Sequence, residues 1–159
     1  MEKNRKCLAA VRIRGLTGVG GDVQETLRML LLNHNCHAVL IDDRPSYLGM
    51  LKKAENHITW GEVSRETVSV LLKKRGRSIG NKRLTDEYAK KVGYSSLDEL
   101  AEAIWKLEVD YRDLPEIEPV FRLHPPRKGF RGGVKKSYSA GGSSGYRGET
   151  INDFLKKMA

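Results

Sequence analysis

Hydrophobic and polar residues alternate at the start of the chain. In 8–14, Val11 and Ile13 alternate with Arg12 and Arg14, which is the period of a strand with one buried face and one solvated face. We therefore expect Arg12 and Arg14 to lie on the open face of a sheet, where they are available to a partner.

A helix and a second strand follow this first strand. The glycine-rich stretch 15–21 leads into an apolar stripe with helical spacing, and Asp22 and Glu25 together form a capping-box pattern at its start. Residues 38–41 read as a second strand, which the turn 42–45 closes. The stripe consists of Val23, Leu27, Leu30 and Leu31.

Two further elements complete a β-α-β-α-β core over 1–63. Ser46 is placed to cap a short helix that ends near Lys53, and 57–60 reads as a third strand. Both helices are expected to pack on one face of a small antiparallel sheet. This predicts an α+β fold in which the other face stays open.

A helical extension occupies 64–119. Ser64 begins a helix that ends in the cations 73–75, and a basic loop is expected to run on to residue 83. A helix capped by Thr85 follows, and then one that begins with the capping box of Ser96 and Glu99. An acidic linker, 108–119, ends the extension.

The last part, 120–159, begins with an edge strand at 120–123, which two prolines end. We call 127–148 the glycine-rich segment, because it consists largely of Gly, Ser, Lys and Arg. It has too few apolar residues to bury a core, so we expect an extended arm that only a partner orders. Thr150 starts a final helix with one apolar face.

The net charge of +9 is concentrated in two segments without acidic residues. Segments 73–83 and 120–148 together carry +13, which leaves −4 for the rest and is typical of a protein that binds a polyanion such as RNA. Tyr138 and Tyr146 are expected to stack on bases or riboses. The candidate cations are Lys73, Lys74, Arg75, Arg77, Lys82 and Arg83 in the first segment, and Arg127, Lys128, Arg131, Lys135, Lys136 and Arg147 in the second.

The sequence gives little support for a nucleotide site, a metal site or a catalytic site. The glycines of 18–21 lack the Lys-Ser/Thr of a phosphate-binding loop, and the cluster 34–37 supplies too few ligands for zinc. Asp42 and Asp43 favour a turn over a catalytic pair. Cys7 and Cys36 favour a reducing compartment, although a disulfide remains an alternative. No apolar run is long enough to cross a membrane, and the start does not read as a signal peptide.

Short motifs run in a fixed order along nearly the whole chain. Those of the core are Arg14-Gly15, the helix 22–32, Asp43-Arg44-Pro45, Gly49-Met50-Leu51, Lys53 and His57-Ile58. Those of the remainder are Ile58-Thr59-Trp60-Gly61, 72–76, 81–86, 121–123, 126–129, 141–148 and Ile151-Asn152. In these motifs the sequence resembles the universal family of large-subunit ribosomal protein thirty, in its longer archaeal form. Its eukaryotic counterpart, large-subunit protein seven, begins with a long basic extension that this sequence lacks.

The resemblance implies a ferredoxin-like sheet and a structural role in the cytoplasmic ribosome. The partners it implies are large-subunit rRNA and neighbouring large-subunit proteins, with no cofactor, metal, small-molecule substrate or catalysis. The alternative hypothesis is an RNA-processing or RNA-modifying factor that holds its substrate with the same basic segments. A third class, a ligand-binding regulatory domain, would not need the basic segments.

Overall fold

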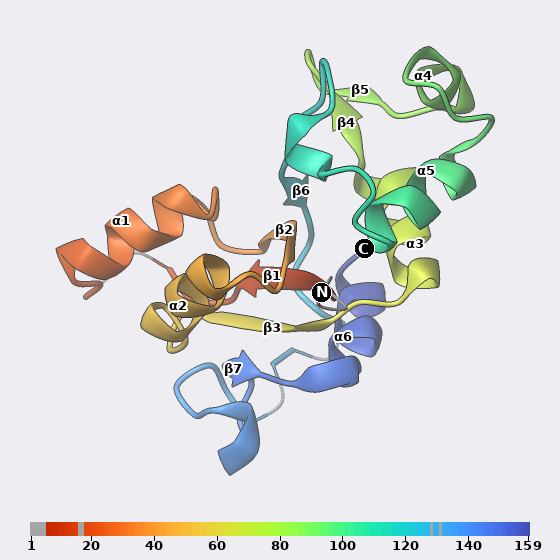
Figure 1. Cartoon of the computed structure of the whole chain (residues 1–159). Helices are drawn as coiled ribbons and strands as arrows, with labels where there is room; N and C mark the ends of the chain where they lie inside the picture. Colours follow the sequence, from red (N-terminus) through yellow and green to blue (C-terminus); the bar gives the residue numbers. More distant parts are fainter. Residues whose placement is uncertain (1–5, 16–17, 128, 131) are drawn as a thin grey trace.

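A five-stranded sheet forms the centre of the chain in a computed structural model that describes residues 6–15, 18–127, 129–130 and 132–159 (Figure 1). The strand order is β6-β2-β1-β3-β7, and β4 and β5 form a separate two-stranded sheet. The strands are β1 (Cys7–Arg12), β2 (His37–Asp42), β3 (Ile58–Glu62), β4 (Arg77–Ser78), β5 (Lys82–Arg83), β6 (Phe121–Arg122) and β7 (Gly145–Tyr146).

Helices connect and cover these strands. None of the described helices is long and apolar enough to span a membrane. The α-helices are α1 (Gly21–Met29), α2 (Pro45–Lys53), α3 (Arg65–Arg75), α4 (Asp86–Lys91), α5 (Leu97–Trp105) and α6 (Ile151–Met158). Three short 3₁₀ turns are η1 (Tyr111–Asp113), η2 (Tyr138–Ala140) and η3 (Gly148–Thr150).

The order β1-α1-β2-α2-β3 confirms the predicted core. β1 is central and antiparallel to both β2 and β3, so that Ala9 lies opposite Leu40 on one side and Gly61 on the other. The strand predicted at 120–123 is confirmed as the edge strand β6, paired with β2. The fold is therefore α+β, with a ferredoxin-like and mostly antiparallel sheet.

Helices α1 and α2 pack on one face of the sheet, as expected, but the other face is not open, because α3, α5 and α6 cover it. Leu8 and Ala10 of β1 face a core that includes Leu27 of α1 and Leu51 of α2. The alternate residues of β1, such as Val11, face a second core built by α3, α5 and α6. In Figure 1, α1 and α2 lie on the left of the view, and α3, α5 and α6 lie on the right.

Arg12 is buried, which corrects the expectation that it lies on a solvated face. Its side chain is 1% exposed, because it alternates with Val11 and so points to the side of the sheet that α1 and α2 cover. Its guanidinium donates to the carbonyls of Leu32 and Arg14, both at 2.9 Å. Arg14 is partly exposed and donates to the carbonyl of Asn56 at 3.5 Å.

Helix starts follow the predicted caps in two cases. The hydroxyl of Ser64 accepts from the amide of Thr67 at 3.3 Å, and that of Ser96 accepts from the amide of Glu99 at 3.4 Å. The predicted cap at Asp22 is wrong. The backbone is already helical at Gly21, so Asp22 lies in the first turn, where its charge still suits the helix dipole.

The two basic segments are more ordered than the sequence indicates. The loop expected at 77–83 is a hairpin of β4 and β5. The extended arm expected at 127–148 is wrong for its second half, because β7 pairs with β3 in parallel and both Ser143 and Ser144 are buried. The final helix is confirmed, and its inner face docks on the body. Its buried residues are Ile151, Phe154, Leu155 and Met158.

Candidate nucleic-acid interface

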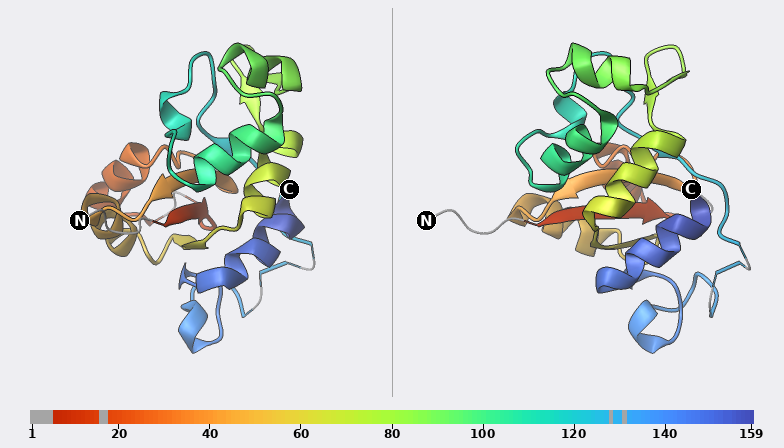
Figure 2. Two further views of the ribbon diagram at one scale, coloured as in Figure 1. Left: turned by 45° about the vertical axis from the view of Figure 1, so that its right-hand side comes forward. Right: turned by 90° about the vertical axis from the view of Figure 1, so that its right-hand side faces the viewer.

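The two basic segments lie at opposite ends of the molecule. In Figure 1, β4 and β5 lie at the top beside α4, whereas β7 and η2 of the glycine-rich segment lie at the bottom. The two views of Figure 2 show the same separation, with the large sheet between them. The described parts of these segments therefore form two surfaces rather than one continuous patch.

The first segment is a helix end that continues directly into a hairpin. At the end of α3, the amide of Gly76 donates to the carbonyl of Leu71 at 2.9 Å. The chain then extends into β4, where Arg77 lies opposite Arg83 of β5. Like charges directly opposite each other destabilise a strand pair, and a bound anion would relieve that repulsion.

The acidic linker supports this hairpin through its backbone. The amide of Ile79 donates to the carbonyl of Glu116 at 3.0 Å, and the amide of Glu118 donates to the carbonyl of Arg77 at 3.0 Å. The linker thus hydrogen-bonds to β4 at Arg77 and to the turn of the hairpin at Ile79. This contact fixes the direction in which the cations of the hairpin project.

The carboxylates of the linker pair with cations outside the hairpin. Glu116 lies 2.7 Å from the ammonium of Lys91, which lowers the pKa of Glu116 by a hydrogen bond and by charge. Glu118 lies 3.1 Å from the guanidinium of Arg122. Glu116 also attracts Lys82 at longer range, so the linker supports the hairpin and offsets only part of its charge.

Two of the six candidate cations of the first segment have local partners. Lys73 lies 2.9 Å from Asp98, whose pKa is lowered by its hydrogen bonds to Ser69 and Lys73. Arg77 donates to the carbonyl of Gly76 at 2.9 Å. The other four form no ion pair with any carboxylate in the described ranges, and we call them the hairpin surface. They are Lys74, Arg75, Lys82 and Arg83.

Arg147 of the glycine-rich segment makes its contacts within the protein. Its guanidinium donates to the hydroxyl of Thr59 at 2.7 Å and to the carbonyl of Ser143 at 2.6 Å. It also lies over the rings of Phe154 at 4.1 Å and Tyr138 at 5.1 Å. Burial lowers the pKa of Arg147 to about 10, so it stays charged at neutral pH. Its contacts join the segment to β3 and α6.

The two tyrosines of this segment also contact the protein itself. The ring of Tyr138 lies against Arg147, and that of Tyr146 lies 6.2 Å from the ring of Trp60. The hydroxyl of Tyr146 donates to the carboxylate of Glu62 at 2.6 Å, and this bond is the main reason why the pKa of Tyr146 is raised to about 12. Stacking on bases stays a prediction for both rings.

Two glycines allow backbones to approach closely in this region. A Cβ added to Gly142 would lie 2.1 Å from the carbonyl oxygen of Lys136, and one added to Gly61 would lie 2.0 Å from that of Gly148. Contacts this short exclude any side chain. These positions therefore need glycine for packing within the protein.

The remaining candidates of the second segment divide into two groups. Arg127, Lys135 and Lys136 are exposed, and none of them forms an ion pair with a described carboxylate. Lys128 and Arg131 lie outside the described residues. Three cations are therefore available to a partner at this end.

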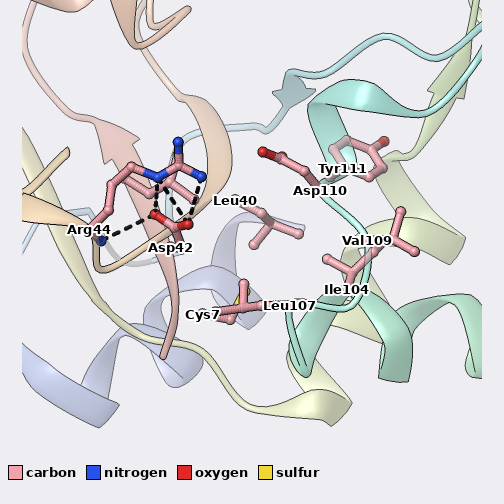
Figure 3. Close-up of a pocket in the computed structure, with 10 residues that line it drawn as sticks. Cys7, Leu40, Asp42, Arg44, Ile104, Leu107, Val109, Asp110 and Tyr111 are labelled. Carbon is pink, nitrogen blue, oxygen red and sulfur yellow. Dashed lines mark hydrogen bonds and ion pairs between the residues drawn. The ribbon is translucent and has the colours of Figure 1, made fainter. Parts of the chain in front are cut away.

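A cavity of about 100 Å³ lies between the sheet and the chain that follows α5 (Figure 3). The backbone amide of Arg44 donates to the carboxylate of Asp42 at 3.1 Å, which confirms the predicted turn, and the guanidinium of Arg44 donates to both carboxylate oxygens. Burial, followed by the charges of Asp42 and Asp110, raises the pKa of the Cys7 thiol to about 12. A thiol with such a pKa is inert, so the cavity is not lined by an activated nucleophile. No cluster of described residues could hold a metal ion.

Sequence reasoning missed the linker contact and the apolar tip of the hairpin. The side chain of Ile79 is 65% exposed at the turn. The Gly80-Asn81 pair is a turn signal that could have revealed the hairpin. No local signal pairs the linker with β4, because that contact joins residues far apart in the chain.

Comparison with known proteins places the chain among ribosomal proteins. Residues 8–58 match the family model described as ribosomal protein L30p/L7e. The protein named large ribosomal subunit protein uL30 from Methanopyrus kandleri is 51% identical over 148 residues, covering 92% of this chain and 99% of that protein. The protein of the same name from Methanobrevibacter smithii is 50% identical over 149 residues, covering 93% and 97% of the two chains.

Proposed function

Because the chain belongs to the ribosomal protein L30p/L7e family, we propose that it is a structural constituent of the large ribosomal subunit. In this proposal it binds and stabilises folded large-subunit rRNA through two basic surfaces, and it contacts neighbouring large-subunit proteins. It acts while bound to the ribosome in the cytoplasm. Its relatives are named as ribosomal proteins and not as enzymes.

The hairpin surface is the observation that supports RNA binding most directly. Lys74 and Arg75 end α3, whereas Lys82 and Arg83 form β5 of the hairpin that the acidic linker supports. None of the four forms an ion pair with a carboxylate of the described residues. A cation without a partner can neutralise a phosphate and release the counterion that the phosphate had condensed. Because the backbone is already fixed, binding costs little further ordering of the chain.

The separation of the two surfaces supports a role in holding a fold of RNA together. Arg127, Lys135 and Lys136 lie in the segment at the opposite end from the hairpin surface (Figure 1). RNA that contacts both ends must pass around the body or come from two separate elements. A protein that binds in this way stabilises one arrangement of those elements over others.

The alternative, an RNA-processing factor, needs a reacting group. The protonated thiol of Cys7 and the ion pair of Asp42 with Arg44 do not supply one in the cavity that they line. The family of ribosomal proteins to which the chain belongs also favours a structural role. We therefore keep the structural proposal alone.

The test is a salt titration of binding to deproteinised large-subunit rRNA. Changing all four cations of the hairpin surface to Ala should make the slope of log affinity against log salt shallower by about three, at roughly 0.7–0.9 for each lost phosphate contact. Lys52→Ala combined with Lys106→Ala, which removes exposed charge elsewhere, is the control and should change the slope far less. An unchanged slope in the fourfold variant would contradict the proposal.

A further inference from the structure

Ile79 stands out among the large apolar residues of the described chain. Its side chain is 65% exposed, compared with 54% for Met29 and 40% for Trp105. It lies at the turn between β4 and β5, beside the cations Lys82 and Arg83. An isoleucine presented to water at the tip of a charged hairpin requires an explanation.

The turn that carries Ile79 is held in one conformation. The amide of Asn81 donates to the carbonyl of Ser78 at 3.0 Å and closes the turn. Gly80 and Asn81 have φ values of +86° and +60°, which lie in the left-handed region. The amide of Ile79 itself donates to Glu116 of the linker. The side chain is therefore presented from a fixed backbone.

The surroundings of Ile79 favour RNA as its partner. Lys82 and Arg83 follow it and form no ion pair with a carboxylate of the described residues. The carboxylate of Glu116 pairs with Lys91 and attracts Lys82 only at longer range. An exposed apolar side chain beside cations is complementary to a surface that carries apolar groups next to negative charges. Unpaired bases and riboses between phosphates have this chemistry.

We propose that Ile79 packs on the face of an unpaired base or its ribose in large-subunit rRNA, while Lys82 and Arg83 bind the adjacent phosphates. This inference rests on the proposed function and assigns a specific contact to the hairpin. Branched apolar side chains act as wedges against bases in other nucleic-acid complexes. Because the contact carries no charge, it adds affinity without releasing counterions.

Ile79→Ala measures this contact in a titration against deproteinised large-subunit rRNA. The change removes three carbons. Full burial of one CH₂ group contributes roughly 0.8 kcal/mol, so partial burial of these three carbons corresponds to about a tenfold loss of affinity. The salt slope should not change. Lys82→Ala combined with Arg83→Ala should instead make the slope shallower by about 1.4–1.8.

Met29→Ala is the matched control, since Met29 is also an exposed apolar residue but lies on α1. It should leave RNA affinity unchanged, and none of these variants should melt much earlier than the wild type. Wild-type affinity in Ile79→Ala would overturn the inference, even where the loss in the double variant upholds the proposed function. Incorporation of Ile79→Ala into large subunits would be measured as well. If this variant binds RNA normally but is not incorporated, Ile79 contacts a protein and the inference is overturned.

Discussion

The hairpin and the glycine-rich segment look alike in sequence and differ in structure. Both are rich in Lys and Arg and lack acidic residues. In the hairpin, Lys82 and Arg83 lie beside a supported turn, and neither forms an ion pair with a carboxylate of the described residues. In the glycine-rich segment, Arg147 is enclosed by two rings and donates to Thr59 and Ser143.

The contacts of a cation therefore determine whether it stabilises the fold or binds an anion. A guanidinium whose donors are already bonded within the fold stabilises the fold, because a phosphate would have to displace those bonds. A cation that projects into water gains little from the fold and can bind an anion at low cost. The following predictions test this comparison, ordered by their expected effect on the free energy of unfolding.

The largest effect is expected from Gly61→Ala, which should detach the glycine-rich segment from the sheet. Its Cβ would lie 2.0 Å from the carbonyl oxygen of Gly148, so η3 must shift. We expect a loss of roughly 2–3 kcal/mol in stability, measured by urea or thermal unfolding. In Gly49→Ala, the control in α2, the new Cβ meets no atom within 4 Å, and this variant should be stabilised. Equal stability of both variants would contradict the packing described here.

Arg147→Ala should lower stability by about 2 kcal/mol, because it removes two hydrogen bonds and two ring contacts. For a chain of this length, that corresponds to a melting temperature lower by about 4–8 °C. Arg127→Ala removes the same charge from an exposed side chain and should melt like the wild type. If the two variants melt alike, Arg147 does not hold the segment on the body.

High pH should weaken the contact of Tyr146 with Glu62. The pKa of Tyr146 is raised to about 12 in the fold, above its ordinary value of 10. The folded state therefore favours the protonated phenol, and its contribution is complete below pH 10 and lost as pH rises toward 12. Between these values, the wild type should lose stability more steeply than Tyr146→Phe. Parallel curves for the two proteins would rule out this linkage.

The smallest effect on stability is expected at the hairpin surface. Lys82→Ala combined with Arg83→Ala removes two exposed side chains, so unfolding should change by no more than about 0.5 kcal/mol. Relief of the repulsion between Arg83 and Arg77 works in the opposite direction and favours the folded state slightly. A marked loss of stability would show that these cations serve the fold, as Arg147 does.

Patterns with a local cause could be predicted from the sequence. The caps at Ser64 and Ser96, the order of the core strands and the edge strand β6 all follow from spacing within a few residues. The apolar face of α6 is likewise a local repeat, and all four of its apolar residues are buried.

Features that depend on distant neighbours could not be predicted. The alternation of Val11 with Arg12 is the same whether one face of β1 is covered or both. Both faces are covered, because α1 and α2 lie on the side of Arg12 and α3, α5 and α6 lie on the side of Val11. The strand β7 consists of Gly145 and Tyr146, which carry no β-pattern, and it forms because β3 offers a free edge. Whether a given arginine is buried or exposed could not be predicted for the same reason, because its charge alone does not show which group it contacts.

Arginine-selective modification of Arg83 and Arg147 tests the central claim most directly. Phenylglyoxal would be applied to the free protein and to intact large subunits, with peptides read by mass spectrometry. Arg83 is exposed, so it should react in the free protein and be protected in the subunit, whereas Arg147 should react slowly in both. Rapid modification of Arg147 in the free protein and its protection only in the subunit, or an Arg83 that stays reactive in the subunit, would contradict the account.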